Sequence, residues 1–119
     1  MKIQVERAYA SPHGKSGARF LVDRLWPRGV SREALHLDGW LKEIAPSDEL
    51  RRWFDHDPKR WEEFEERYFA ELDENAEALA PLRQAVKRGG VTLVFGAKDE
   101  ERNNAVALRD YLTRRRVRR

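Results

Sequence analysis

The chain has 119 residues, of which 38% are charged and 40% are aliphatic or aromatic, and it contains no cysteine. This length predicts one domain, residues 1–119, with a single hydrophobic core, and the lack of cysteine excludes disulfides, thiol nucleophiles and thiolate metal sites. No apolar run approaches the roughly 20 residues of a membrane span. The N-terminus shows no signal-peptide core, so we expect a cytoplasmic protein of bacterial type without a membrane partner.

The formal net charge of +3 hides an asymmetry along the chain. Residues 57–77 hold nine acidic side chains against three basic ones, so this stretch carries −6 and the remainder +9. A basic tail at about residues 114–119 consists mostly of arginine. Such a tail can attract nucleic acid through its phosphates, or it can simply be solvated charge.

Two strands are predicted near the N-terminus. In residues 2–9, Ile3 and Val5 alternate with polar neighbours, which is typical of a strand. Residues 18–25 contain a continuous apolar run, as expected of a strand covered on both faces. Only a loop by composition, residues 10–17, separates the two. We therefore expect them to pair antiparallel, as a hairpin-like unit.

Polar residues that favour helix starts precede the predicted helices from residue 31 onward. They are Ser31, Ser47, Asp57, Asn75 and Asp99. A further helix is indicated by apolar residues at steps of three and four across residues 37–44. Pro81 lies inside the helix that follows Asn75 and removes one of its backbone hydrogen bonds, so we expect a kink or a break there.

Residues 91–97 form the third clear strand, which is again continuously apolar. Apolar strands separated by helices predict an α/β fold. We expect a small layered domain with a short, mainly parallel central sheet flanked by helices, in which a long helical crossover joins the second and third strands.

Polar residues gather where the second and third strands end. Ligands of open α/β sheets bind beyond the carboxyl ends of the strands. If these two strands are parallel neighbours, residues 23–29 and 96–104 open on the same edge of the sheet. Arginine forks there recognise phosphate or carboxylate, a helix N-terminus favours an anion, and a tryptophan can stack on a base or ring.

This edge is therefore the predicted binding site for a phosphorylated or nucleotide-like small molecule. The predicted ligand contacts are Arg24, Trp26, Arg28, Lys98, Asn103 and Asn104. Asp23 and Asp99 are the carboxylates placed for acid–base catalysis. The alternative is a structural lock, in which Arg24 pairs with a carboxylate and Trp26 plugs the end of the sheet.

Histidine spacing and glycine motifs give no sign of a metal or a nucleotide cofactor. His13, His36 and His56 lack the spacing of metal ligands. The segment HGKSG, residues 13–17, lacks the spacing of a P-loop, and no dinucleotide-binding or serine-hydrolase motif occurs. We expect no metal and no cofactor, and whether the protein is an enzyme stays open.

Two further functions stay open as alternatives to a small-molecule site. The basic tail favours a nucleic-acid-binding module. Four tryptophans in so short a chain favour an interaction domain without catalysis, such as a homodimer formed through surfaces that carry Trp40, Trp53 and Trp61.

Three long segments, residues 20–33, 40–75 and 91–112, resemble the YeaO-like branch of the domain-of-unknown-function family numbered 488. The resemblance covers nearly the whole chain in order, and it implies a small cytoplasmic α/β protein of uncharacterised activity. In the broader family the third strand is often followed by cysteines and a Cys-His-Arg element. This chain has Gly96 and Asn103-Asn104-Ala105 in the matching stretch, so the resemblance carries no thiol or metal chemistry to it.

Overall fold

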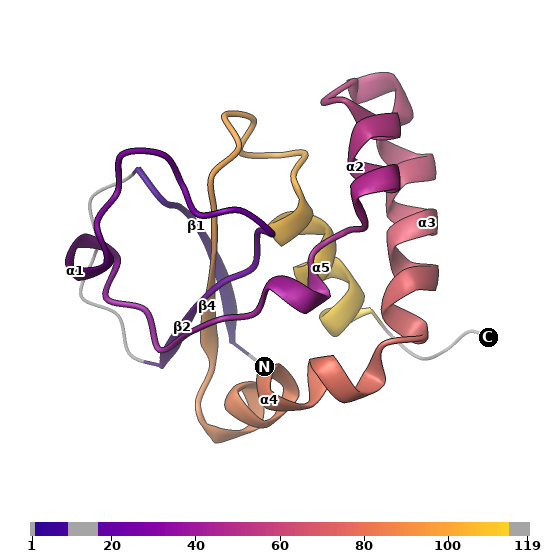
Figure 1. Cartoon of the computed structure of the whole chain (residues 1–119). Helices are drawn as coiled ribbons and strands as arrows, with labels where there is room; N and C mark the ends of the chain where they lie inside the picture. The colour runs from indigo at the N-terminus through magenta and orange to yellow at the C-terminus, as the bar shows by residue number, and fades with distance from the viewer. Residues whose placement is uncertain (1, 10–16, 115–119) are drawn as a thin grey trace.

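The computed structural model describes residues 2–9 and 17–114, and these build a four-stranded sheet with helices on both faces (Figure 1). The strands are β1 (Ile3–Arg7), β2 (Ala18–Leu21), β3 (Gly39–Trp40) and β4 (Val91–Phe95), in the order β1-β4-β2-β3. Every neighbouring pair is parallel. The α/β fold with a short parallel sheet is thus confirmed.

The expected antiparallel pairing of the first two strands is wrong, because β4 lies between them. Leu93 of β4 is the register partner of Val5 in β1 and of Phe20 in β2, and both pairings are parallel. Every residue of β4 is buried, whereas β1 is only partly covered. The most apolar strand takes the central position, where both of its faces are protected from water, and the alternating strand takes the edge.

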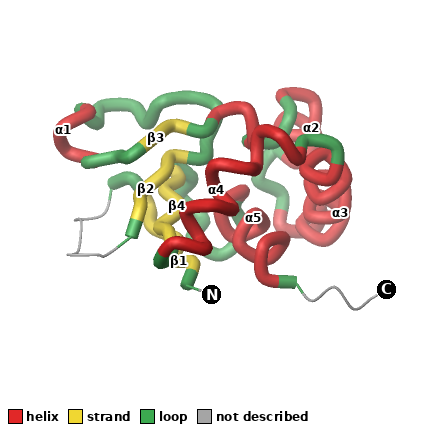
Figure 2. Tube along the Cα trace, turned by 90° about the horizontal axis from the view of Figure 1, so that it is seen from below, coloured by secondary structure: helices red, strands yellow, loops and turns green. Residues whose placement is uncertain are grey.

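The helices divide between the two faces of the sheet. They are α1 (Arg32–Leu35), α2 (Asp48–Phe54), α3 (Trp61–Asp73), α4 (Ala76–Arg88) and α5 (Asn104–Thr113). Helices α4 and α5 pack on one face, α3 packs against α5, and α2 packs against α3 (Figures 1 and 2). Helix α1 lies on the opposite side, where its Leu35 packs with Trp26, Val30, Leu37 and Trp40 (Figure 2). No helix within the described ranges is long and apolar enough to cross a membrane.

Two of the predicted caps form as expected. The hydroxyls of Ser31 and Ser47 each accept a backbone N–H three residues ahead at 3.1 Å, which pairs an amide that the first helical turn leaves free. Asp57 accepts the N–H of Lys59 at 3.0 Å and starts a short 3₁₀ turn (Pro58–Arg60) that leads into α3.

Helix α4 continues through Pro81 without a break. The proline is exposed, so water can reach the carbonyl that loses its partner.

Two helix predictions are wrong in place or type. Residues 37–44 form β3 and a 3₁₀ turn (Lys42–Ile44), because the backbone N–H of Leu41 pairs with the carbonyl of Leu21 and draws this stretch onto the sheet. The last helix begins at Asn104 with Asn103 as its cap, and not directly after Asp99. Asp99 instead caps a turn that precedes the helix.

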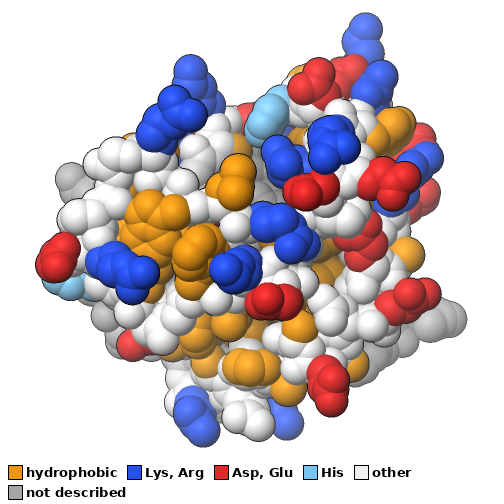
Figure 3. Space-filling model, in the orientation of Figure 1, with side chains coloured by type: hydrophobic (Ala, Val, Ile, Leu, Met, Phe, Trp, Pro, Cys, Tyr) orange, Lys and Arg blue, Asp and Glu red, His pale blue; other side chains and the backbone are white. Residues whose placement is uncertain are grey.

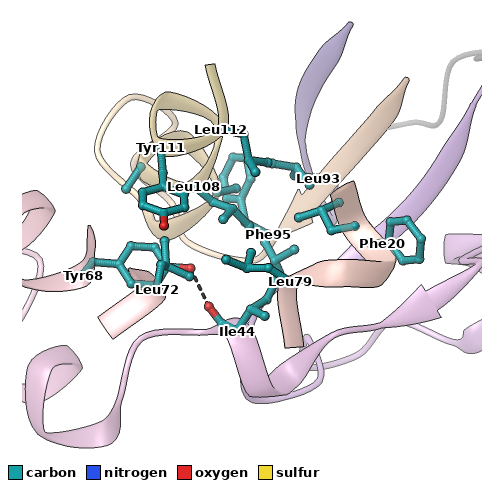
Figure 4. Close-up of a cluster of buried hydrophobic side chains, with 14 of the residues drawn as sticks. Phe20, Ile44, Tyr68, Leu72, Leu79, Leu93, Phe95, Leu108, Tyr111 and Leu112 are labelled. Atoms are coloured by element: carbon teal, nitrogen blue, oxygen red, sulfur yellow. Dashed lines mark hydrogen bonds between the residues drawn. The ribbon is translucent and has the colours of Figure 1, made fainter. Parts of the chain in front are cut away.

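The main core lies between the sheet and helices α3, α4 and α5 (Figure 4). Within this core the hydroxyl of Tyr68 donates to the backbone carbonyl of Ile44 at 2.6 Å, and both residues are almost fully buried. Burial raises the pKa of the Tyr68 hydroxyl, so it stays a donor at all ordinary pH values. This bond fixes the segment before α2 against α3.

A carboxyl pair lies where α3 packs against α5. Glu65 of α3 faces Asp110 of α5, and its Oε2 atom is buried without a hydrogen-bond partner among the described residues. Burial first, and then the neighbouring Asp110, raise the pKa of Glu65 to about 7. Two carboxylates this close resist simultaneous ionisation.

We expect Tyr68→Phe to lower the free energy of unfolding by about 1–3 kcal/mol, because it leaves the buried carbonyl of Ile44 unpaired. Tyr9→Phe is a matched control, since its hydroxyl makes a 2.9 Å bond to the carbonyl of Arg28 at the surface. The control should change stability by less than about 0.5 kcal/mol. Urea unfolding measures the free energy of unfolding of both variants. Equal losses of stability would show that the buried hydrogen bond stabilises the fold no more than the exposed one.

Stability should depend on pH through Glu65. Its folded pKa is raised, so the contribution of the protonated carboxyl is complete below pH 4.5 and is lost as the pH rises through about 7. Glu65→Gln removes this titration, so the stability of the variant relative to wild type should increase between pH 5 and pH 8. Glu66→Gln, at an exposed position next to it, is the control. Parallel pH profiles for wild type and Glu65→Gln would contradict the assignment.

Candidate functional site

A cavity of about 210 Å³ opens at the carboxyl edge of the sheet. Its walls come from the ends of β2 and β4, from residues 45–46, from α2 and from the start of α5. In Figure 3 the face of the molecule is hollowed between its sheet side and its α2–α3 side, and charged and histidine side chains stand along the rim. The cavity therefore lies where parallel sheets usually bind ligands.

Asp23 joins the two strand ends at the base of this cavity. Its Oδ2 atom accepts the backbone N–H of Gly96 at 2.8 Å, and its backbone carbonyl accepts the indole N–H of Trp40 at 2.7 Å. The side-chain amide of Asn104 donates to the carbonyl of Val22 at 2.9 Å. A Cβ atom on residue 96 would lie 3.3 Å from Asp23 Oδ2, so glycine leaves room for the close approach.

Burial raises the pKa of Asp23, although the Gly96 N–H and the Asn104 amide both act to lower it. The cost of removing the charge from water therefore outweighs the two hydrogen bonds that favour the charged form. A carboxyl held in this way is bonded at one oxygen. It is available to a ligand only from the side that faces the cavity.

Arg24 is the cation that the structure places deepest in the site. One terminal nitrogen makes two long bonds, at 3.3 Å to the carbonyl of Ala45 and at 3.5 Å to that of Pro46. Its Nε atom is buried, has no hydrogen-bond acceptor in the part of the chain that is described, and lies 4.0 Å from Asp48. A guanidinium with unused donors at a cavity wall suits an anionic partner.

Two further arginines stand on the rim, and each is paired on its outer side. Arg51 lies 3.2 Å from Asp48, and Arg102 lies 3.6 Å from Asp99. Both pairs are half exposed, so they hold the side chains only weakly. His56 also lines the cavity, and it follows α2 in a left-handed backbone conformation.

Three backbone amides at the start of α5 and in the turn before it are already paired. Asp99 Oδ1 accepts the N–H groups of Glu101 and Arg102 at 2.9 and 3.0 Å. The bond from Glu101, followed by the bond from Arg102, holds the pKa of Asp99 below its usual range. Asn103 Oδ1 accepts the N–H of Val106 at 2.9 Å. The expected anion site at this helix N-terminus is thus largely filled by the chain's own side chains.

The structure brings four of the eight predicted site residues to the cavity wall, and their roles in binding stay predictions. The four are Asp23, Arg24, Asn103 and Asn104. Arg28 and Lys98 are exposed beyond it. Trp26 lies on the other face of the sheet, where its ring meets that of Trp40 edge-on at 5.4 Å and its N–H donates to the carbonyl of Val30 at 2.6 Å.

Sequence analysis missed the contribution of α2 and α3 to this site. Arg51, Phe54 and His56 come from α2 and the turn after it, and Phe64 comes from α3. Phe54 and Phe64 lie at helical spacing from other apolar residues, which is typical of core positions, and both pack into the core. Nothing in that spacing tells that the helix would stand over the strand ends, because this position depends on contacts between α2 and α3.

The other predicted surfaces are only partly covered by the described residues. Residues 115–119 of the basic tail and His13 lie outside them. Trp53 is half-buried between the guanidinium groups of Arg60 and Arg67, 5.2 and 4.5 Å from its ring. No group of three potential metal ligands occurs in residues 2–9 and 17–114.

Comparison with known proteins places these observations in a family. The family model described as "Inactive DUF488-N3 subclade" matches residues 2–119. The uncharacterized protein YeaO of Escherichia coli strain K12 is 41% identical over 112 residues, which cover 94% of this chain and 97% of that protein. The uncharacterized protein Rv3073c of Mycobacterium tuberculosis is 40% identical over 114 residues, 96% of each chain. No solved structure matches significantly.

Two substitutions of Asp23 should separate its hydrogen bond from its charge. Asp23→Ala leaves the N–H of Gly96 unpaired and should lower the free energy of unfolding by about 1–3 kcal/mol. Asp23→Asn keeps an acceptor oxygen without the buried charge. The folded pKa of Asp23 is raised, so its stabilising contribution is present below pH 3.8 and lost above the folded pKa. The free energy of unfolding of the Asn variant, relative to wild type, should therefore increase from pH 3 to pH 7.

Urea unfolding at several pH values measures both effects. Asp48→Ala, which removes an exposed carboxylate near the same cavity, is the control and should cost no more than about 0.5 kcal/mol. Equal losses for Asp23→Ala and Asp23→Asn would mean that charge, and not the bond to Gly96, gives Asp23 its role.

Proposed function

The chain belongs to the inactive DUF488-N3 subclade, its YeaO-like branch, and on that premise we propose that it is a binding protein for a small anionic molecule. The ligand would occupy the cavity at the carboxyl edge of the sheet, with phosphate, a nucleotide-like group or a carboxylate as its anionic part. The description of the subclade as inactive favours binding over catalysis.

The observation that carries this proposal is the state of Arg24. A buried donor without an acceptor costs free energy, by about 1–3 kcal/mol for a neutral group and more for a charged one. The Nε atom of Arg24 is such a donor in the described residues. Because this Nε atom is itself buried, an anion in the cavity would bond the terminal nitrogens of the same guanidinium, and so stabilise a charge that the free protein pairs only through long contacts.

The charges around the cavity support the same conclusion. Arg24, Arg51 and Arg102 bring three positive charges to its wall and rim. Asp48 and Asp99 lie beside these arginines outside the lining, and Asp23 is the carboxylate that lines the cavity itself. The raised pKa of Asp23 further weakens the negative charge there. The field in the cavity therefore favours a negative group.

Catalysis has little support from the side chains at this site. The described residues that line the cavity include no serine, threonine, cysteine, lysine or tyrosine that would serve as a nucleophile. Asp23, one of the two predicted acid–base residues, is tied to Gly96, and the other, Asp99, is held by two backbone amides outside the cavity. Both carboxylates thus have structural partners.

A thermal-shift screen tests the proposal with phosphate, nucleotides, carboxylates and short oligonucleotides. A specific anion at one hundred times its dissociation constant should stabilise the protein by about 2.7 kcal/mol and raise its melting temperature by several degrees. Arg24→Met should abolish this shift. Arg28→Ala should retain it, because this exposed arginine lies outside the cavity.

An equal loss of the shift in both variants would indicate attraction to overall positive charge and would overturn the pocket. Stabilisation by oligonucleotides that requires residues 115–119 would favour the nucleic-acid alternative instead. The same screen therefore separates a site from a charged surface.

A further inference from the structure

The polar groups of the cavity restrict which anion it can hold. Phosphate sites in α/β proteins draw on several free backbone N–H groups at a strand end or helix start. Here the N–H of Gly96 is bonded to Asp23, those of Glu101 and Arg102 to Asp99, and that of Val106 to Asn103. Recognition of the anion therefore depends on arginine side chains.

Among these arginines, Arg24 has the donors to spare. Its Nε atom has no hydrogen-bond acceptor in the described chain, its terminal nitrogen makes only long bonds, and its nearest carboxylate, Asp48, lies 4.0 Å away. Arg51 and Arg102 have closer carboxylate partners, at 3.2 and 3.6 Å. One guanidinium fork matches one carboxylate in two parallel bonds. A dianion would also meet the Asp23 carboxyl on the same wall, so a single negative charge suits the site best.

The rest of the cavity is lined mainly by apolar side chains. Phe54 and Phe64 stack at 4.4 Å with an angle of 27° between their rings, and Pro46 and Ala97 continue the apolar lining. A flat ring finds favourable contacts against such aromatic and proline surfaces. A ribose would instead need polar partners that this part of the wall lacks among the described residues.

Leu25 marks the mouth of the cavity. It lines the cavity and is 66% exposed, and only Tyr9 is another large apolar side chain exposed in the described ranges. An exposed leucine beside an apolar cavity can cover part of an apolar ligand. The volume of about 210 Å³ lies below the 300–1,000 Å³ typical of sites for drug-sized molecules, so the ligand is small.

We infer that the ligand is a small aromatic monocarboxylate, with its carboxylate on Arg24 and its ring between Leu25, Pro46 and Phe54. This inference rests on the proposed function, because it names the class of anion that the same cavity takes. It narrows the prediction from sequence, which named a phosphorylated or nucleotide-like molecule.

Calorimetric titration of the full chain with matched probes tests the inference. Phenylacetate carries both features, phenylacetamide lacks the charge, acetate lacks the ring, and inorganic phosphate and adenosine monophosphate represent the other class. Phenylacetate should bind at least about tenfold more tightly than each of the other four, since a charge-assisted bond and a buried ring each contribute about that factor.

Two variants locate the binding. Arg24→Met should weaken phenylacetate by about tenfold or more and leave phenylacetamide unchanged. Leu25→Ser, at an exposed position where folding is not at risk, should weaken phenylacetate and leave acetate unchanged. Arg28→Ala should leave all five probes unchanged. If Arg24→Met fails to fold, the comparison of probes on wild type and Leu25→Ser decides the question.

The outcomes separate this inference from the proposed function. Tighter binding of phosphate or of the nucleotide, with dependence on Arg24, would overturn the aromatic carboxylate and leave the anion site standing. Equal binding of phenylacetate and phenylacetamide would overturn the role of the charge. No binding by any of the five probes would overturn both.

Discussion

The hydrogen bond from the N–H of Gly96 to the Asp23 carboxyl is the constraint on which the site depends. It ties the end of β2 to the end of β4, and Asn104 adds a second link from the start of α5 to Val22. Together these bonds set where the last helix begins relative to the sheet. This arrangement costs free energy, because a carboxylate that is bonded to the backbone here must leave water. The raised pKa of Asp23 reflects that cost.

The need to pair backbone groups explains why the site has arginines with unused donors but few free backbone amides. Short polar side chains, Asp23, Asp99 and Asn103, satisfy the backbone groups that strand ends and helix starts leave unpaired. The long side chain of Arg24 reaches past them to the carbonyls of residues 45–46, which only half satisfy it. Local hydrogen bonds thus occupy several of these amides, whereas the guanidinium of Arg24 keeps part of its bonding capacity free.

The features that the sequence predicted correctly depend on residues that are close to one another in the chain. Ser31 and Ser47 cap their helices because the bond spans three residues, and β4 is covered on both faces because its own run is apolar. The meeting of residues 23 and 96 followed from the rule for parallel sheets. Surfaces that are distant in the chain compete for burial, and a local sequence pattern does not show which of them pack together. This competition sets the strand order, the face of the sheet on which Trp26 lies, and the position of α2.

Gly96 connects the fold to the family description. A Cβ atom at residue 96 would lie 3.3 Å from the Asp23 carboxyl. The bond from Gly96 to Asp23 therefore leaves little room for a side chain at this position. The end of β4 thus holds a structural bond beneath the cavity, in a chain whose family model is described as an inactive subclade.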